Sequence, residues 1–329
     1  MKLVLPMAGL GTRLRPHTWS KPKPLVPVAG KTVLGHFLDP VIALPDLEEV
    51  VLIVGYLGDQ IREYMGEHYP KLRVRYVVQE ELSGQSHALW LAREELEGPA
   101  LIGFVDTLIE TNFDIPGDEA AIWVHKVEDP RRFGVAEINA GSMVKHLVEK
   151  PDEPQSNLAV VGFYYFEKAE RLITAIQRQL EGGEKLKGEY FLADAINVML
   201  DDSLSMRAVP VDAWNDCGTQ DALLATNRYL LDHGRDNTGD LVSGNGVVIE
   251  PPVFIDPSAK VSRSVIGPHV SIGAGCVIEQ ASIRDTVIDA HSQINHSKIH
   301  GSLIGRDCQI SDLDGSFNIG DASQIRGNG

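Results

Sequence analysis

A glycine-rich segment follows the first apolar run of the chain and carries two cations. Gly9-Leu10-Gly11-Thr12-Arg13 comes directly after Lys2–Pro6, and Lys23 stands further along between two prolines. Glycines let the backbone approach a phosphate closely, and successive amide N–H groups in such a turn point at one anion. A guanidinium can bind two phosphate oxygens at once, and a lysine adds a point charge. The segment therefore predicts a polyphosphate site.

The segment differs from two common phosphate-binding loops. A dinucleotide-binding fingerprint needs a third glycine where this chain has Leu14, and a P-loop needs Gly-Lys-Ser/Thr at the end of the loop, where this chain has Leu14-Arg15-Pro16. Taken alone, Gly9-x-Gly11 predicts only a tight turn. The flanking prolines predict that Lys23 lies on a stiff, extended stretch.

Two aspartates stand at positions where a carboxylate could hold a metal ion. Asp106 ends the apolar run Leu101–Val105, and Asp216 stands in Trp214–Thr219 just before a predicted helix. A carboxylate at a strand end reaches the crevice at the edge of a parallel sheet. Mg²⁺ prefers a few carboxylates together with substrate phosphate oxygens. Each aspartate taken singly is typical of a strand end or a helix cap.

Length and composition restrict the class of protein. With 329 residues the chain predicts two domains. Its 46 acidic and 30 basic residues give a net charge of −16, which argues against binding to nucleic acid or to an anionic membrane surface. No apolar run approaches the ~18 residues of a membrane helix, and the N-terminal run is too short for a signal peptide. Three widely spaced cysteines, Cys217, Cys276 and Cys308, predict a reduced, cytoplasmic protein.

The chain up to about residue 236 alternates between strand and helix patterns, which predicts an α/β domain around a mostly parallel, Rossmann-like sheet. The predicted strands are Lys2–Pro6, Val50–Val54, Arg73–Val78, Leu101–Val105, Ala121–His125, Val135–Ile138 and Ala159–Phe166. The predicted helices are Thr32–Ala43, Gly58–His68, Gln85–Glu95, Ala169–Leu180, Phe191–Leu200 and Gln220–Leu231. We place the first domain at residues 1–236.

Residues 237–329 have a different pattern, which we interpret as the end of a linker (His233–Gly246) and a repeat domain. Isoleucines recur six residues apart, as at Ile266, Ile272 and Ile278, and glycine often follows them. A six-residue repeat predicts a parallel β-helix with aliphatic columns inside. A β-sandwich is the less favoured interpretation, because its strands alternate and are spaced more widely. Asp312–Phe317 interrupts the rhythm and predicts a loop that covers or redirects the last coil.

The motifs together resemble those of the sugar-1-phosphate nucleotidyltransferases, also called nucleotide-sugar pyrophosphorylases. The family signature, Gly-x-Gly-Thr-Arg and then Pro-Lys-Pro-Leu-x-Pro-Val, stands here as Gly9–Arg13 and Pro22–Val28. The resemblance continues along the chain through Gln79 with Gly84–Ala88, Phe133–Glu137, Glu149–Pro151 with Ser156-Asn157 and Val161-Gly162, and Trp214–Thr219. Long, thymidylyltransferase-like members of the family also carry a left-handed β-helix after the catalytic domain.

The resemblance implies a Mg²⁺-dependent attack by a sugar-1-phosphate, glucose-1-phosphate in the first instance, on the α-phosphate of dTTP or UTP. Pro6–Arg13 looks more like the uridylyltransferase version of the signature, so thymine and uracil both stay open. Val105 stands where the family has glycine before its first metal-binding aspartate. The implied catalytic residues are Arg13, Lys23, Asp106 and Asp216, of which the two aspartates are the metal ligands. The implied nucleotide-binding residues are Ala8, Gly9, Gly11, Thr12, Arg13, Gln79 and Gly84. The implied sugar-phosphate-binding residues are Gly134, Glu149, Lys150, Val161 and Glu189.

Two other functions are open from the residues. Six-residue repeats also build acyltransferases, for which His269, His291, His296 and His300 would be candidate catalytic residues. A nucleotide-sugar-binding regulatory homologue without turnover is the other alternative. The aliphatic end of the β-helix predicts a homo-oligomer. Because every candidate site residue precedes His233, the tail is expected to be dispensable for the chemistry.

Overall fold

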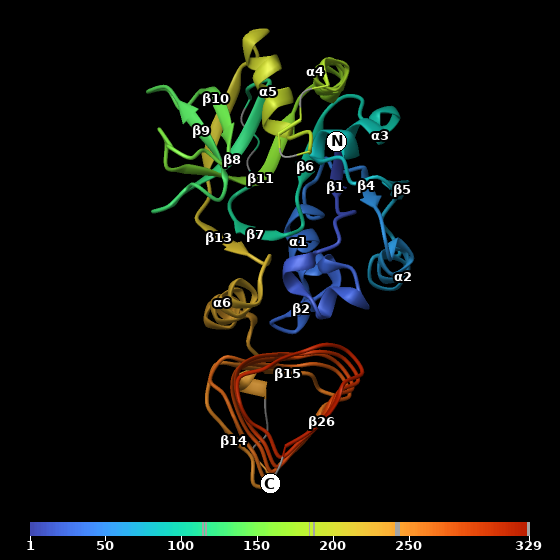
Figure 1. The fold of residues 1–329 in the computed structure, drawn as a ribbon, viewed down its shortest axis with the longest axis vertical. Helices are drawn as coiled ribbons and strands as arrows, with labels where there is room; N and C mark the ends of the chain where they lie inside the picture. Colours follow the sequence, from blue (N-terminus) through green and yellow to red (C-terminus); the bar gives the residue numbers. More distant parts are fainter. Residues whose placement is uncertain (114, 116, 184, 187, 241–243, 328–329) are drawn as a thin grey trace. The chain divides into compact units, whose positions relative to one another are not determined.

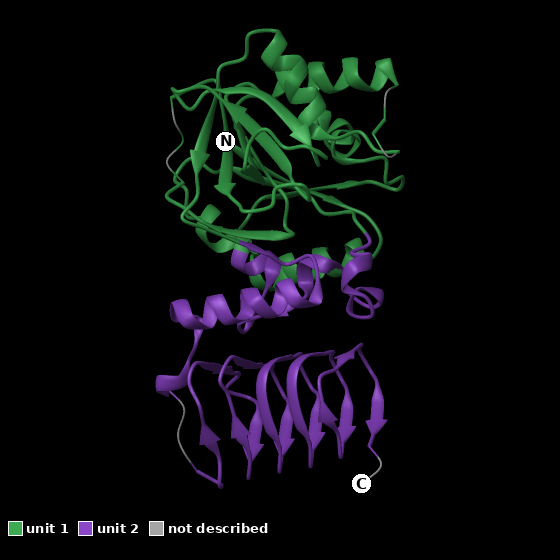
Figure 2. Cartoon of the chain, turned by 60° about the vertical axis from the view of Figure 1, so that its left-hand side comes forward, with its two compact units in different colours: residues 1–9, 37–214 green, residues 10–36, 215–329 purple. Residues whose placement is uncertain are grey.

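The structure is a computed structural model that describes residues 1–113, 115, 117–183, 185–186, 188–240 and 244–327. The chain forms two compact units, residues 1–9 with 37–214 and residues 10–36 with 215–329 (Figure 2). The second unit therefore joins the greater part of the signature segment with the tail. The boundary expected at residue 236 divides the chain into two consecutive domains, and it stays a prediction. The compact units instead group segments that are not consecutive in sequence.

A nine-stranded mixed sheet forms the centre of the first unit (Figure 1). Its strands are β1 (Lys2–Pro6), β4 (Glu49–Val54), β5 (Val74–Val78), β6 (Ala100–Gly103), β8 (Ala120–Lys126), β9 (Gly134–Ile138), β10 (Val144–Glu149), β11 (Leu158–Phe166) and β12 (Met206–Pro210). The main path runs β10-β9-β11-β6-β1-β4-β5, with β8 beside β11 and β12 beside β8. The pairs β6–β1, β1–β4, β4–β5 and β12–β8 are parallel, and β11 runs antiparallel to its neighbours. All six residues of β4 are buried, as expected for a parallel strand covered on both faces.

Four helices belong wholly to the first unit: α2 (Gly58–His68), α3 (Gln85–Leu91), α4 (Ala169–Gly182) and α5 (Leu192–Asp201). Leu89, Leu172 and Ile196 of these helices share one buried core with Val4 and Ile102 of the sheet. The bounds lie close to the predicted ones, and α2 matches its predicted range. The predicted helix Gln85–Glu95 is divided, because α3 is followed by the 3₁₀ turn η4 (Arg93–Glu95). The predicted α/β class of this part is confirmed.

The remaining elements outside the repeat domain are short, or belong to the second unit. They are β2 (Pro27–Val28), β3 (Lys31–Thr32), α1 (Val33–Val41), β7 (Thr107–Glu110), β13 (Ala213–Asp216), α6 (Gln220–Leu230), the 3₁₀ turns η1 (Thr12–Leu14), η2 (His17–Trp19), η3 (Lys23–Leu25) and η6 (Thr238–Asp240), and the π-type turn η5 (Leu231–Arg235). Thr219 caps α6 by accepting a hydrogen bond from the Ala222 amide at 3.3 Å. Of the expected linker, residues 241–243 lie outside the described residues.

The tail forms stacked parallel coils, so the predicted β-helix is confirmed (Figures 1 and 2). Its strands are β14 (Val248–Ile249), β15 (Val253–Ile255), β16 (Lys260–Ser262), β17 (Val265–Ile266), β18 (Val270–Ile272), β19 (Val277–Glu279), β20 (Ser282–Ile288), β21 (Gln293–Asn295), β22 (Lys298–Ile304), β23 (Gln309–Ser311), β24 (Asp314–Gly315), β25 (Asn318–Ile319) and β26 (Gln324–Arg326). The aliphatic columns are buried inside the coils, for example Ile278, Ile294 and Ile310, which pair along one sheet. Burial of these columns supplies the core of the repeat domain.

The corners of the coils are formed by more than small residues. Several corners use other residues with left-handed backbone, including His269, Gln280, His296 and Asp307. Asp and His adopt this region more readily than most residues, which explains their use at corners. Glycine does remain where space is short: a Cβ at Gly273 would lie 2.8 Å from the amide nitrogen of Ala290.

The prediction that Asp312–Phe317 forms a covering loop was wrong. Strand β24 within this range pairs with β22, and the chain continues through β25, which also pairs with β22. Gly315 takes the position next to Ile299 where an aliphatic residue would continue the column. The rhythm is therefore broken by a shorter coil with one rung position left without a side chain, while the coiling persists.

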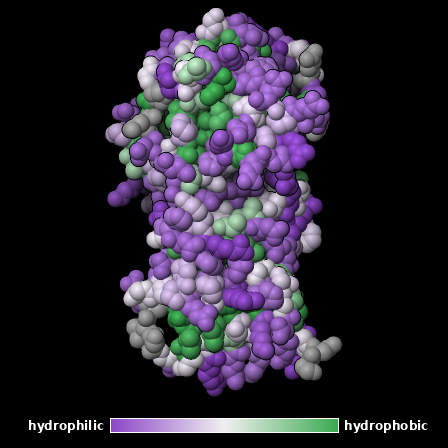
Figure 3. All heavy atoms as spheres, turned by 90° about the vertical axis from the view of Figure 1, so that its left-hand side faces the viewer, coloured by the Kyte–Doolittle hydropathy of each residue, from purple (hydrophilic) through white to green (hydrophobic). Residues whose placement is uncertain are grey.

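The surface drawn in Figure 3 is mostly hydrophilic. Hydrophilic residues predominate over the face drawn in Figure 3, with smaller apolar patches between them. Among the helices of the described residues, none is long and apolar enough to cross a membrane. The three cysteines all lie in the described part of the chain, are buried and form no disulfide.

Replacing a column residue should destabilise the β-helix selectively. Ile294→Ala removes a fully buried side chain and should lower the free energy of unfolding by about 2–5 kcal/mol. Val277→Ala is the control, because Val277 is 37% exposed on the same sheet and its truncation should have a much smaller effect. The tail has neither Trp nor Tyr. Urea unfolding followed by far-UV circular dichroism therefore includes the coils, whereas tryptophan fluorescence reports the rest of the chain. Equal destabilisation by both variants would contradict the packing role.

Candidate active site

The glycine-rich segment turns through Gly11, whose φ of 60° lies in the left-handed region. A Cβ at this position would lie 3.0 Å from Thr18 Cγ2 and 3.1 Å from Lys23 Cβ. The Gly11 carbonyl accepts hydrogen bonds from the Leu14 amide at 2.9 Å and from Thr18 Oγ1 at 2.8 Å. Glycine is thus required by conformation and by close approach. The turn brings Lys23 beside the 3₁₀ turn η1 that carries Arg13.

The first residues of the signature belong to the first unit. Ala8 is buried, and a Cβ built on Gly55 would lie 2.7 Å from the Ala8 carbonyl oxygen. The Met7 amide donates to the Ile53 carbonyl at 2.8 Å, just after β1. Gly9 is exposed, and a Cβ there would meet no atom within 4 Å. The backbone around Gly9 is therefore accessible to a ligand.

Lys23 does not lie on an extended stretch, and this expectation was wrong. It begins the 3₁₀ turn η3, in which the Val26 amide donates to the Lys23 carbonyl at 3.0 Å and the Leu25 amide donates to the Pro22 carbonyl at 2.9 Å. Pro22 has the expected extended backbone. Pro24 stands inside the turn at a position where a missing amide hydrogen costs nothing, so it permits the turn.

Arg13, Asp216 and Gly218 meet in the second unit. The Gly218 amide donates to Asp216 Oδ1 at 2.7 Å. A Cβ on Gly218 would lie 2.8 Å from Asp216 Oδ1 and 3.2 Å from Arg13 Nη2. The glycine thus lets a guanidinium and a carboxylate approach the same backbone turn. Arg13 itself is exposed, so its guanidinium is accessible to an anion.

Asp106 lies in the turn between β6 and β7 and is half-buried. It belongs to the first compact unit and Asp216 to the second. In the described part of the chain, no group of three or more His, Cys, Asp or Glu side chains could hold a metal ion. A metal ion at either carboxylate would complete its coordination with water or substrate oxygens, as Mg²⁺ usually does.

The candidate base-binding residues meet in the first unit. Gln79 is buried, and its Nε2 donates to the Gly84 carbonyl at 3.3 Å. Gly84 has a φ of 105°, and a Cβ there would lie 2.6 Å from the backbone nitrogen of Tyr190. The Tyr190 amide donates to the Ser83 carbonyl at 3.0 Å, which fixes the two segments together. Gly84 is thus required by its conformation and by the close packing.

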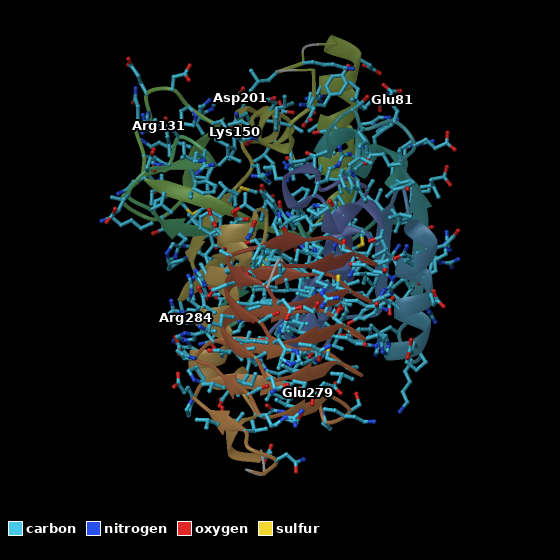
Figure 4. All side chains as sticks on the ribbon, turned by 60° about the horizontal axis from the view of Figure 1, so that its bottom comes forward. Glu81, Arg131, Lys150, Asp201, Glu279 and Arg284 are labelled. Atoms are coloured by element: carbon cyan, nitrogen blue, oxygen red, sulfur yellow. The ribbon has the colours of Figure 1, made fainter. Side chains whose placement is uncertain are left out.

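Glu149 and Lys150 form an ion pair at 3.0 Å (Lys150 is labelled in Figure 4). Lys150 has a φ of 45°, in the left-handed region. Its ammonium lies 4.9 Å from the centre of the Phe191 ring. A Cβ on Gly134 would lie 2.9 Å from Glu149 Oε2. The structure therefore brings together three of the predicted sugar-phosphate residues, Gly134, Glu149 and Lys150.

Val161 and Glu189 are placed less closely with this group. Val161 is buried in β11, where the pairing with β8 shifts register between Val160 and Tyr164. Such bulges are common beside active sites, because they release backbone groups from the ladder. Glu189 is exposed and exchanges backbone hydrogen bonds with Leu186 at 3.0 and 3.1 Å. Its assignment stays a prediction.

Aromatic residues beside the site were not among the candidates. The Phe133 and Trp214 rings meet edge to face with centres 4.7 Å apart. The buried Trp214 Nε1 has no hydrogen-bond partner among the described residues. Burial, together with the charge of Glu149, raises the pKa of the Tyr164 hydroxyl above its ordinary range. The Trp-x-Asp spacing could have indicated Trp214, whereas nothing local in the sequence indicates Tyr164 or Phe191.

Comparisons with known proteins match both the catalytic part of the chain and most of the tail. The nucleotidyl transferase family model matches residues 2–233, and the model of the GMPPB C-terminal domain matches residues 249–315. A glucose-1-phosphate thymidylyltransferase of Streptomyces antibioticus is 32% identical, with 94% of each chain covered. The bifunctional protein GlmU of Methanocaldococcus jannaschii is 31% identical over 94% of this chain and 79% of its own.

Solved structures share the fold. A UDP-glucose pyrophosphorylase complexed with UDP-glucose has a TM-score of 0.62 at 20% identity, covering 70% of this chain and 98% of its own. A nucleoside-diphosphate-sugar pyrophosphorylase from Vibrio cholerae has a TM-score of 0.60 at 23% identity, covering 69% of this chain and 99% of its own.

The α/β sheet, the glycine-rich signature and the family match define the protein as a nucleotidyltransferase. Because the family model matches residues 2–233 and thymidylyltransferases match 94% of the chain, the chain belongs to the sugar-1-phosphate nucleotidyltransferase family. The resemblance inferred from the motifs is thereby confirmed at the level of the family.

His17 gives the second unit a pH-dependent stability. It is buried, and its Nε2 donates to Asn318 Oδ1 at 2.7 Å. Burial lowers the pKa of His17 below 6.5, although the hydrogen bond to Asn318 opposes this shift. The unfolded chain therefore binds a proton at this site more readily than the folded chain. The contribution of His17 to the free energy of unfolding is therefore fully present above pH 6.5. It is lost as the pH falls through the lowered pKa of His17.

His17→Gln should weaken this pH dependence, because the amide keeps a hydrogen-bond donor and cannot titrate. We expect the wild-type melting temperature to fall more than that of the variant between pH 7.5 and 5. Comparing the two proteins cancels the contribution of the other histidines. An equal fall in melting temperature for wild type and variant between pH 7.5 and 5 would contradict the assigned role of His17.

Proposed function

We propose that this enzyme transfers a nucleotidyl group from dTTP or UTP to a sugar-1-phosphate, with glucose-1-phosphate as the first candidate. A phosphate oxygen of the sugar-1-phosphate forms a bond to the α-phosphorus of the triphosphate. The bond from that phosphorus to the oxygen bridging to the β-phosphate breaks, and pyrophosphate leaves. The products are an NDP-sugar and pyrophosphate. The nucleophile is already an anion, so the reaction needs charge neutralisation and positioning more than a strong base.

The triphosphate is assigned to the glycine-rich segment. The exposed Arg13 guanidinium and the neighbouring Lys23 provide positive charge beside the Gly11 turn. Ala8, Gly9 and Thr12 contribute backbone groups of the same segment, and Gln79 with Gly84 is assigned to the base. Thymine and uracil present the same pairing edge and differ by one methyl group, a difference worth about 1–3 kcal/mol in a binding pocket.

Asp106 and Asp216 fit Mg²⁺ by the chemistry of their ligand atoms, since both supply carboxylate oxygens. When bound, the ion would neutralise phosphate charge as it builds on the leaving pyrophosphate. The Gly218 amide orients the Asp216 carboxylate by its 2.7 Å hydrogen bond. Arg13 near the same turn limits the accumulation of negative charge there.

The sugar-1-phosphate is assigned to the Glu149–Lys150 pair. Lys150 offers an ammonium to the phosphate, and Glu149 offers an acceptor to a sugar hydroxyl. Gly134 leaves room beside Glu149, and the backbone at Val161 is free of regular pairing with β8. Glu189 is assigned to the sugar by the resemblance of Gly188-Glu189-Tyr190 to the family motif.

The observation that carries the proposal is the meeting of Arg13 and Asp216 at Gly218. The chain that holds this site matches thymidylyltransferases over 94% of its length. The direct test is pyrophosphate release with Mg²⁺ over a panel of dTTP, UTP, ATP, CTP and GTP against several sugar-1-phosphates. We expect dTTP or UTP with glucose-1-phosphate to give the highest kcat/KM. Binding of NDP-sugars without pyrophosphate release from any pair would indicate a regulatory homologue instead.

Removing either candidate triphosphate cation should weaken the reaction. Arg13→Ala and Lys23→Ala should each lower kcat/KM for the triphosphate about 10- to 100-fold, because a charged hydrogen bond contributes roughly 1.5–3 kcal/mol. The melting temperature of the ligand-free protein should change little. Arg15→Ala is the matched control, since Arg15 is exposed in the same segment. An equal loss in the control, or unfolding of the ligand-free variants, would oppose the phosphate role.

Neutralising either aspartate should remove most of the Mg²⁺-dependent turnover. Asp106→Asn and Asp216→Asn should each lower kcat by about 100-fold or more, as expected for the loss of several kcal/mol of charge stabilisation. The dependence of the residual rate on Mg²⁺ should shift to higher concentration. Asp212→Asn is the control, because Asp212 is exposed and precedes β13. Unchanged rate and metal dependence in either test variant would remove that residue from the metal site.

A further inference from the structure

The stretch between the two candidate triphosphate cations is bonded to the end of the β-helix. His17 and the Arg15 carbonyl both bond to Asn318, at 2.7 and 3.4 Å. Ser20 Oγ donates to Asp321 Oδ2 at 2.7 Å. Residues 318–321 belong to the last turns of the tail, so this part of the signature segment is attached to coils about 300 residues away in sequence.

The contact between Pro16 and Gly320 is too close to accept a side chain on the coil. A Cβ on Gly320 would lie 2.9 Å from Pro16 Cβ. Glycine here therefore lets the coil approach the segment directly. The contact lies beside the Asn318 and Asp321 hydrogen bonds, so polar and apolar contacts support one interface within the second unit.

Lys21 is the most buried charge of this interface. Its side chain is only 7% exposed and forms ion pairs with Asp289 and with Asp321, the latter at 3.2 Å. The two carboxylates are stabilised further: the Ala290 amide donates to Asp289 Oδ1 at 2.7 Å, and the Arg306 amide donates to Asp321 Oδ1 at 2.9 Å. Burial opposes ionisation of Asp321, but Lys21, Ser20 and the Arg306 amide outweigh it, so the pKa of Asp321 lies below its ordinary value.

We propose that Lys21 is a positioning residue that fixes the triphosphate-binding segment to the β-helix through Asp289 and Asp321. Arg13 precedes the attached stretch, and Lys23 follows Lys21 by two residues. Thr18 connects the stretch to the phosphate loop, because its Oγ1 donates to the Gly11 carbonyl at 2.8 Å. A continuous path of contacts therefore runs from the last coils to the Gly11 turn.

The physical reason is preorganisation. Between Leu10 and Val26 the segment contains only short 3₁₀ turns, which provide few internal hydrogen bonds. A segment that had to order itself around the triphosphate would lose affinity to conformational entropy. The coils hold it in place before the ligand arrives, and a displacement of about 1 Å at a reacting group can cost about 100-fold in rate.

This proposal rests on the proposed triphosphate role of Arg13 and Lys23, and it departs from the expectation that the tail is dispensable for chemistry. It assigns to the tail a contribution to substrate binding that none of the candidate site residues provides. The prediction follows that breaking the Lys21 ion pairs affects the triphosphate more than the sugar-1-phosphate.

The test compares full-length Lys21→Met and Lys21→Arg with the wild type. Lys21→Met should raise KM for the triphosphate about 10-fold, with less than about a 2-fold change in KM for the sugar-1-phosphate. Lys21→Arg keeps a cation between the carboxylates and should recover most of the wild-type KM. Hydrogen exchange measured by mass spectrometry should become faster in peptides covering residues 10–36 of Lys21→Met and stay unchanged in peptides covering helices α4 and α5 of the first unit.

Arg263→Met is the control, because Arg263 pairs with Glu279 within the tail (Glu279 is labelled in Figure 4). It should leave both KM values and the exchange of residues 10–36 unchanged. If Lys21→Met fails to fold, Asp321→Asn, which retains the Asp289 pair, carries the same readouts. Wild-type KM and exchange in the test variant, or equal changes in the KM for both substrates, would overturn the proposal. If the wild type itself releases no pyrophosphate, the proposed function fails, and the exchange of residues 10–36 alone decides whether Lys21 holds the segment.

Discussion

The segment from Leu10 to His36 carries both candidate triphosphate cations but forms little regular structure of its own. It consists of three 3₁₀ turns, the two-residue strands β2 and β3, and the beginning of α1. Such a chain cannot fix a guanidinium and an ammonium by its own backbone hydrogen bonds. The surrounding structure has to provide the missing bonds, and much of the second unit is arranged to do so.

Asn227 illustrates how these bonds are provided. It is fully buried on α6 and accepts hydrogen bonds from the Ala29 amide at 3.0 Å and from Ser271 Oγ at 2.6 Å. Its Nδ2 donates to the His269 carbonyl at 3.1 Å. One amide side chain thereby joins the signature segment, the helix after Asp216 and the corner of the coils at His269. A buried amide with all three contacts satisfied fixes one arrangement of these elements, because any other would leave a polar group unpaired.

The sequence predicted much of this architecture because local patterns carry it. Continuous β-branched runs such as Val50–Val54 indicate buried parallel strands, and the six-residue repeat indicates stacked coils. The signature residues Gly11, Arg13 and Lys23 were recognisable because the chemistry of phosphate binding restricts residue types. The 3₁₀ turn at Lys23 was missed because proline permits both an extended chain and a tight turn. The bonds of Lys21 to Asp289 and Asp321 could not be predicted, because they join residues about 270–300 apart in sequence.

The dimensions of the coils explain how one lysine reaches both carboxylates. Ile288, Ile304 and Ile319 stack in one column on three successive coils. Asp289 directly follows Ile288, and Gly320-Asp321 directly follows Ile319. Backbone positions two coils apart are separated by about 10 Å. One lysine ammonium can contact carboxylates on both coils only if the carboxylates extend towards each other. Gly305 stands on the coil between them, and a Cβ there would lie 2.6 Å from Asp321 Oδ1. The absence of a side chain at Gly305 lets the Asp321 carboxylate extend over the middle coil towards Asp289. Gly305 thus allows two carboxylates on separate coils to share Lys21.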